Sequence, residues 1–215
     1  MDCFIIGQII RGTIRLRTIN TATGMRYSRT ELRDIGISVL VLSVAFSIMF
    51  VRRGSDLNIL MLLAISAVIV CASFVAHELS HKFVAQRYGA WAEYRMFPIG
   101  LVFALAMSFF GIIFAAPGVV YINGQIDREM NGKISAAGPA MNIVLGTAAI
   151  AAALLTSGLA SSVFWIMASI NAFFAVFNMI PLMPFDGSKI YKWNVPVYLI
   201  MITLAIALLA VVLFF

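Results

Sequence analysis

Long apolar runs separated by short polar segments dominate the chain beyond its first part, residues 1–34, which is polar. A helix needs about 20 mainly apolar residues to cross the hydrocarbon core of a bilayer. Uncharged runs close to this length occupy residues 35–51, 57–76, 136–157, 161–178 and 195–215. The pattern predicts an α-helical polytopic membrane protein with about five spans.

The two ends of this pattern suggest how the chain is organised. Residues 1–34 are expected to form a short cytosolic N-terminal lead, in which the alternating residues 13–19 indicate a strand of a hairpin. No internal repeat divides the remainder, so residues 35–215 are expected to be a single membrane-embedded domain. In the second span the helical pattern continues past residue 76 to about Tyr88, and Gly89 is expected to end it.

Residues 98–122 form an apolar segment of a different kind, because Pro98, Gly100, Gly111, Pro117 and Gly118 interrupt it. One straight helix is not expected here. With a cytosolic N-terminus, all lysines and arginines except Arg52 and Arg53 fall on the cytosolic side if this segment turns back without crossing. That agrees with the positive-inside rule. The sequence therefore predicts a re-entrant or β-containing membrane segment, in a multi-pass protein of the cell membrane.

Composition and charge support the bilayer as the principal partner. Hydrophobic residues make up 62% of the 215 residues and charged residues only 11%, against about 25% in soluble domains. The formal net charge of +6 is explained by basic loops that face anionic lipid. No basic patch interleaved with aromatic residues is present, so no nucleic-acid partner is expected. Nothing in the pattern predicts an oligomeric state.

The candidate chemistry lies at the end of the second span, in His77-Glu78-Leu79-Ser80-His81, which contains both histidines of the chain. On a helix, residues four apart lie on one face, so the two imidazoles can share a zinc ion. The glutamate between them can act as the base that activates water, as in other HExxH hydrolases. His77 and His81 are therefore predicted zinc ligands and Glu78 the catalytic residue. The alternative is a span whose polar end is simply wetted at the membrane interface.

A catalytic zinc site usually has a third protein ligand, and Asp186 is the best candidate. It is one of two acidic residues in strongly apolar sequence, the other being Glu78, and a charge at bilayer depth costs about 2.5–3.5 kcal/mol. The span 161–178 is predicted to end on the same side as the histidines, so Asp186 can return to their depth. The alternative is an aspartate that caps a turn before Gly187.

Two motifs together resemble the site-2 protease family of intramembrane zinc metalloproteases. HELSH on a membrane helix is followed far downstream by the segment 178–187, which has the pattern N-x-x-P-x-x-P-x-D-G. Residues 137–142 are similar to the A-G-P-x-x-N element of that family, and Pro98-Ile99-Gly100 resembles its membrane-embedded sheet region. The likeness covers roughly residues 57–190. It departs from the family at Ser188, where a second glycine is usual, and in the apolar character of 98–122.

The resemblance implies one catalytic Zn²⁺ held by His77, His81 and Asp186, with Glu78 as general base. It also implies that Asn178 and Asn142 help to bind substrate or the oxyanion, whereas interhelical hydrogen bonding is the alternative for both amides. The expected activity is hydrolysis of peptide bonds in or near transmembrane segments of protein substrates, in regulated proteolysis. The active-site end would face the cytosol.

Two other function classes use the same residues. A metal-handling membrane transporter could bind metal through the two histidines and Asp186, although transporters usually show repeated halves and several ionisable groups along a path. An inactive relative could bind transmembrane helices without cutting them. The full set of catalytic groups favours the protease.

Overall fold

The computed structural model describes residues 19–20, 25–113 and 117–214. Within these residues, five helical stretches are long and apolar enough to cross a membrane. They are α1 (Arg29–Arg52), the continuous stretch Ile59–Arg87, α5 (Arg128–Leu155), α6 (Gly158–Asn178) and α8 (Val195–Phe214). The predicted fold class, an α-helical polytopic membrane protein with about five spans, is confirmed.

The second span carries the histidine motif at its far end and changes its winding just before it. It consists of α2 (Ile59–Val70), a π-helical turn η1 (Cys71–Val75) and α3 (Ala76–Arg87). Such π-turns inside α-helices often occur at functional sites. Gly89 follows the last turn with φ of 78°, the left-handed conformation that commonly ends a helix. The predicted extension of this span beyond residue 76 is therefore confirmed.

The apolar segment 98–122 turns back as predicted, but Pro98-Ile99-Gly100, expected in a sheet region, begins a helix instead, and the first strand of the sheet lies before the segment. Strand β3 (Trp91–Met96) leads to the short helix α4 (Pro98–Ser108), and the chain returns in strand β4 (Gly118–Asn123). β3 and β4 pair in an antiparallel register that sets Trp91 opposite Asn123 and Met96 opposite Gly118. Helix α4 has 11 residues, about 16 Å of helix, which is too short to cross the hydrocarbon core. The chain therefore enters at Trp91 and leaves at Asn123, directly beside each other.

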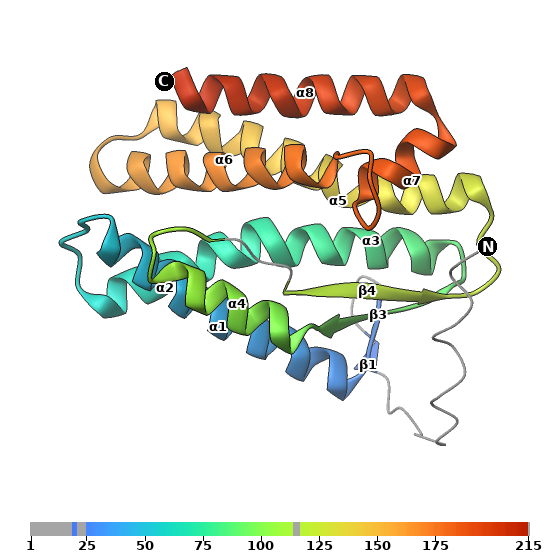
Figure 1. Cartoon of the computed structure of the whole chain (residues 1–215), viewed down its shortest axis with the longest axis horizontal. Helices are drawn as coiled ribbons and strands as arrows, with labels where there is room; N and C mark the ends of the chain where they lie inside the picture. The colour runs from blue at the N-terminus through green and yellow to red at the C-terminus, as the bar shows by residue number, and fades with distance from the viewer. Residues whose placement is uncertain (1–18, 21–24, 114–116, 215) are drawn as a thin grey trace.

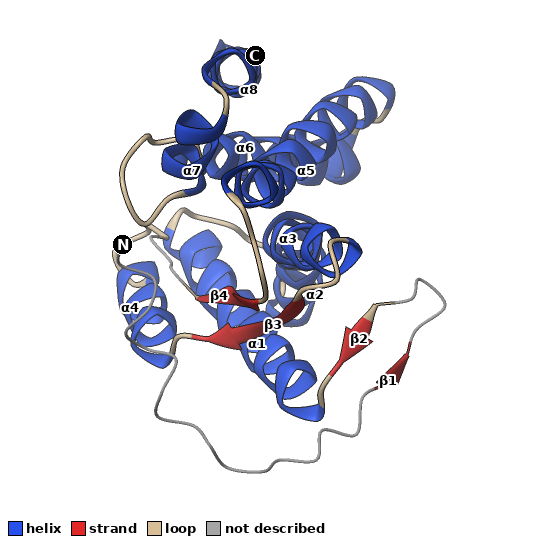
Figure 2. Cartoon of the chain, turned by 90° about the vertical axis from the view of Figure 1, so that its right-hand side faces the viewer, coloured by secondary structure: helices blue, strands red, loops and turns tan. Residues whose placement is uncertain are grey.

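The helix with the histidines occupies the middle of the molecule (Figure 1). Seen end-on, α3 lies between the β3–β4 sheet on one side and helices α5 and α6 on the other (Figure 2). Helices α1 and α4 flank the sheet, and α8 lies on the outer side of α6. A short helix, α7 (Asp186–Trp193), connects the loop after α6 to α8. The site is therefore built where the two halves of the chain face each other.

The N-terminal region differs in detail from the predicted lead. A small hairpin pairs β1 (Ile19–Asn20) with β2 (Arg26–Tyr27), while most of the strand expected at residues 13–19 lies outside the described residues. Helix α1 starts at Arg29, before the apolar run that begins at residue 35. Ser28 caps it by accepting a hydrogen bond from the backbone N–H of Glu31 at 3.1 Å. Capping thus extends the helix into polar sequence.

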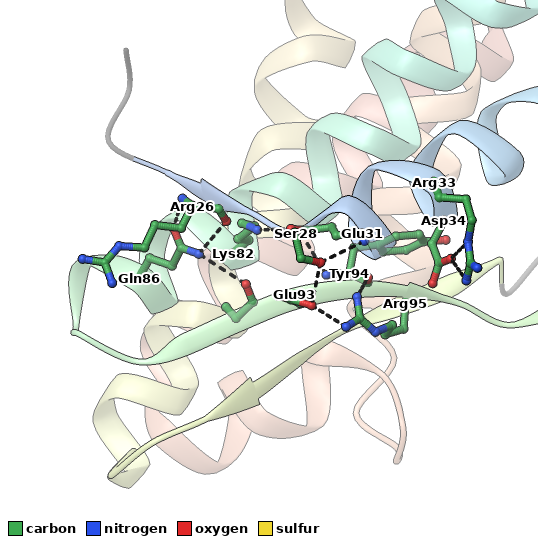
Figure 3. A network of polar contacts seen from close by, with 11 residues as sticks. Arg26, Ser28, Glu31, Arg33, Asp34, Lys82, Gln86, Glu93, Tyr94 and Arg95 are labelled. Carbon is green, nitrogen blue, oxygen red and sulfur yellow. Dashed lines mark hydrogen bonds and ion pairs between the residues drawn. The ribbon is translucent and has the colours of Figure 1, made fainter. Parts of the chain in front are cut away.

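A buried polar network attaches this helix start to the rest of the fold (Figure 3). The carboxylate of Glu31 forms an ion pair with Lys82 of α3 and accepts a hydrogen bond from the backbone N–H of Tyr94 in β3 at 2.9 Å. Glu31 and Lys82 are both fully buried. The hydroxyl of Ser28 donates to Glu93 of β3 at 3.1 Å. One carboxylate therefore joins α1, the histidine helix and the sheet.

Candidate metal centre

Helix α3 places the two histidines one turn apart on the same buried face. His77 and His81 are 5% and 8% exposed, and their rings meet edge-to-face with centroids 4.7 Å apart. Their Nε2 atoms lie 3.0 Å from each other. The i, i+4 spacing predicted from the motif therefore brings both imidazoles to one point.

Asp186 reaches the same point from the other half of the chain. It is the first residue of α7, after the loop that follows α6. Its Oδ2 atom lies 3.1 Å from Nε2 of His81 and 3.5 Å from Nε2 of His77. Its Oδ1 atom faces the ammonium group of Lys189 at 3.5 Å. The three residues predicted as metal ligands are thus brought together and are all buried.

The spacing of these three atoms fits a metal ion. In a tetrahedral zinc site with bonds of about 2.0–2.2 Å, ligand atoms lie about 3.3–3.5 Å apart. The observed separations of 3.0, 3.1 and 3.5 Å are close to these edges. Two imidazole nitrogens and one carboxylate oxygen are also the donor set of known catalytic zinc sites, which leave a fourth position open. The residues present therefore fit zinc.

The far sides of both rings are held by hydrogen-bond acceptors. Nδ1 of His81 lies 2.7 Å from the carbonyl oxygen of Ile134, and Nδ1 of His77 lies 2.5 Å from Oδ1 of Asn142, both in α5. With a proton on each Nδ1, a neutral ring turns the lone pair of Nε2 toward Asp186. Three acceptors then converge, and a cation between them removes their repulsion. Outer acceptors of this kind orient metal-binding histidines in many proteins.

The surroundings of Asp186 favour the ionised carboxylate. Burial by itself would raise the pKa of Asp186, but when Nε2 of the histidines carries a proton, the charge on the His81 ring and the N–H groups of both rings that then face the carboxylate outweigh burial. Together they hold the pKa of Asp186 well below its usual range. An ionised carboxylate is the form that coordinates a metal.

A glycine in α5 allows this helix to approach the histidines closely. A Cβ atom at Gly138 would lie 2.6 Å from Nε2 of His77 and at least as close to Nε2 of His81. Any side chain at this position would therefore occupy the space where the ligand atoms meet. This explains the glycine of the A-G-P-x-x-N element as a requirement of the site.

Glu78 and Asn178 line a cleft beside the three converging residues. The cleft has a volume of about 430 Å³ and lies between the β3–β4 sheet and the end of α6. Glu78 lies next to the backbone of Val120 in β4. The side-chain nitrogen of Asn178 donates one hydrogen bond to the carbonyl of Phe174 at 3.0 Å. The proposed base and one of the two predicted substrate amides thus share one cleft.

Asn142 is placed differently from Asn178. Its side chain is fully buried behind His77, and it does not line the cleft. Its nitrogen donates to the carbonyl of Ser73 at 3.0 Å and to Oδ1 of Asn171 at 2.8 Å. These contacts are the interhelical hydrogen bonds that the sequence left open as the alternative.

Sequence reasoning missed several groups that support the histidines. The carbonyl of Ile134 is a backbone group, which no residue pattern reveals. Asn171 was embedded in an apolar predicted span, and a polar amide in such a span is a signal that could have identified it. Ser73 lies in the π-turn, which the sequence did not predict.

The fold and the site define a class of protein, a polytopic membrane protein with a metalloprotease-type centre. A relative from Methanocaldococcus jannaschii, named "Putative zinc metalloprotease", is 40% identical over 174 residues, which cover 79% of this chain and 87% of the relative. The chain belongs to the family of this zinc metalloprotease.

A second relative is more distant and longer. "Putative zinc metalloprotease Rip3" of Mycobacterium tuberculosis is 30% identical over 137 residues, which are 60% of this chain and 31% of that protein. No family model matches the chain, and no solved structure matches it.

Proposed function

We propose that this zinc metalloprotease is an intramembrane protease of the site-2 type, which hydrolyses peptide bonds in or near transmembrane segments. The observation that carries the proposal is the position of His77, Glu78 and His81 at the end of a membrane span, with Asp186 brought beside them. Regulated proteolysis of membrane proteins is the corresponding cellular role. The bilayer and single-span membrane proteins are the proposed partners.

His77, His81 and Asp186 are the proposed ligands of one zinc ion. When bound there, zinc would lower the pKa of a water molecule and polarise the scissile carbonyl. The protein's part is to hold the ligands in place. Hydrogen bonds to Nδ1 of both rings orient them, and Gly138 leaves room for the metal.

Glu78 has the role of proton carrier. Its carboxylate lies in the cleft, close enough to His77 and Asp186 to interact electrostatically with both. We propose that it accepts a proton from the attacking water and then passes that proton to the nitrogen of the leaving amine. The same oxygen atoms serve both transfers, so no second acid is required.

Substrate is proposed to bind along β4. A transmembrane helix keeps its carbonyl groups in internal hydrogen bonds, so it must unwind locally before hydrolysis. The sheet described here has two strands, β3 and β4, and residues Gly118–Ile122 of β4 line the cleft. An unwound segment can add as a further strand beside β4. Asn178 would then donate its amide to the substrate carbonyl or the developing oxyanion.

The proposed orientation follows from charge. With the N-terminus in the cytosol, the C-terminal end of α3 and the loop before α7 face the cytosol as well. The centre would therefore be reached from the cytosolic side of the cell membrane. Arg52 and Arg53, at the opposite end of α1, would face outward.

The decisive experiment compares purified wild-type protein, zinc-stripped protein and the Glu78→Gln variant on a panel of single-span membrane proteins. We expect cleavage by the wild type alone and a loss of at least about 100-fold in both others, since general acid–base catalysis contributes about 10²–10⁴-fold. Glu78→Gln should still bind about one zinc per chain, because position 78 is not a proposed ligand.

Equal cleavage by the wild type and Glu78→Gln would disprove the mechanism. Zinc binding without cleavage of any substrate would favour the inactive relative. Zinc flux into proteoliposomes that Glu78→Gln leaves unchanged would favour the transporter.

A further inference from the structure

Two buried amides behind His77 form a chain of hydrogen bonds whose direction is set at one end by the backbone. The side-chain nitrogen of Asn171 donates to the carbonyl of Met167 at 2.9 Å and to the hydroxyl of Ser73 at 2.9 Å. A carbonyl oxygen can only accept, so the Asn171 nitrogen must point there. Its Oδ1 atom is then the atom that faces Asn142.

The direction is passed on through the second amide. Because Oδ1 of Asn171 accepts, the nitrogen of Asn142 lies on that side, 2.8 Å away, and also donates to the carbonyl of Ser73 at 3.0 Å. This leaves Oδ1 of Asn142 to face Nδ1 of His77 at 2.5 Å. That oxygen can only accept, so the proton of a neutral His77 ring sits on Nδ1 and the lone pair on Nε2.

We infer that Asn142 and Asn171 are a pair of positioning residues that keep His77 in the Nδ1-protonated form, with Nε2 available to a metal ion. The inference rests on the proposed zinc function, because the Nδ1-protonated form is useful only if Nε2 binds a metal ion. Both amides are 0% exposed, and the contacts join four elements: η1, α3, α5 and α6. Away from water, no solvent molecule can replace a lost partner, so each bond matters more.

This assignment changes the role predicted for Asn142. Both protons of its nitrogen and its oxygen are engaged by Ser73, Asn171 and His77. It therefore acts on the metal ligand and not on substrate, in contrast to Asn178 in the cleft. Helix α6 also supports the site twice, once through Asn171 and once by leading into the loop that delivers Asp186.

The tautomer can be measured without any metal. The chain has two histidines, so ¹⁵N-histidine NMR of tag-free, metal-stripped protein reports on His77 and His81 alone. In the wild type we expect both rings to be protonated at Nδ1 when neutral. Asn142→Leu should shift His77 to a mixture of tautomers. His81 is the internal control, because its Nδ1 donates to the Ile134 backbone, which the substitution leaves intact.

Zinc affinity, measured by competition with a chelator, provides the second readout. Asn142→Leu should weaken zinc binding about 10- to 100-fold, the effect usual for outer partners of metal-binding histidines. Asn171→Leu removes one of the two acceptors that fix Asn142, so we expect a weaker change in the same direction for both readouts. Ser169→Ala is the matched control in α6, since among the described residues the Ser169 hydroxyl bonds within its own helix, to the carbonyl of Trp165.

An unchanged His77 tautomer in Asn142→Leu would overturn the inference, as would wild-type zinc affinity in both leucine variants. If Asn142→Leu does not fold, Asn171→Leu and the same two readouts decide. The NMR result does not depend on activity, so a protein that binds no zinc or cuts nothing would refute the proposed function while leaving the hydrogen-bond chain testable.

Discussion

At the scale of single residues, the metal centre depends as much on an absent side chain as on the ligands. A methyl group at position 138 would overlap Nε2 of both histidines. We therefore predict that Gly138→Ala displaces α5 or the rings, costs about 1–3 kcal/mol of folding free energy and weakens zinc binding at least tenfold. Chelator competition and thermal unfolding in detergent measure the two effects.

The matched control for this substitution is Gly36→Ala in α1. Nothing lies within 4 Å of a Cβ atom at Gly36, so alanine should leave zinc binding unchanged and stabilise the helix by about 0.5–1 kcal/mol. Equal zinc affinity for Gly138→Ala and the wild type would show that α5 does not need to approach so closely.

The same scale shows what a residue pattern can and cannot reveal about the site. His77 and His81 were recognisable because helical spacing alone puts them on one face. Asp186 was recognisable because a charged carboxylate in apolar sequence costs free energy, and such a residue usually has a function. The orientation of the His77 ring could not be recognised from the sequence, because it depends on the side chains of Asn142 and Asn171, which come from two other helices.

At the scale of elements, the ion pair between Glu31 and Lys82 fixes the start of α1 to the histidine helix. Removing one charge leaves the other buried without its opposite charge, which typically costs about 3–5 kcal/mol. We predict that Glu31→Gln and Lys82→Met each lower the unfolding temperature, and that the double variant is more stable than either single one. Thermal unfolding in detergent measures all three.

The prediction has a clear contrary result. If the losses of the two single variants simply add in the double variant, the two charges are not coupled in the folded protein. Glutamine at position 31 can still accept the hydrogen bond from Tyr94, so the comparison isolates the ion pair from the contact with β3.

At the scale of the whole molecule, the five spans could be predicted because hydrophobic run length is set by bilayer thickness. The exact ends of these helices could not be predicted, because side-chain caps and contacts with other elements determine where each helix begins and ends. Ser28 extends α1 into polar sequence, and α5 starts at Arg128 inside a stretch that composition alone marks as polar. The register of β3 with β4 was also beyond prediction, since β3 lies before the apolar segment 98–122, and that segment, which contains most of β4, shows no period that fixes strand pairing.

The fold back of segment 98–122 decides the side on which every later loop lies, and this can be tested in intact cells. In a chain with Cys3 and Cys71 replaced, single cysteines at Asp56, Gln125 and Ser157 probe three exposed loop positions. We predict that a membrane-impermeant thiol reagent labels Asp56→Cys and Ser157→Cys from outside. Gln125→Cys should react only after permeabilisation, because β4 returns beside β3.

A single crossing by segment 98–122 would give the opposite pattern for the later positions. Gln125→Cys would then react from outside together with Asp56→Cys, and Ser157→Cys would be protected. In that case Arg128 and Lys133 would lie outside, against the positive-inside rule, and helix α5 would have to run antiparallel to the direction that brings Ile134 and Asn142 to the two histidines. The labelling pattern therefore tests the topology on which the assembly of the metal centre depends.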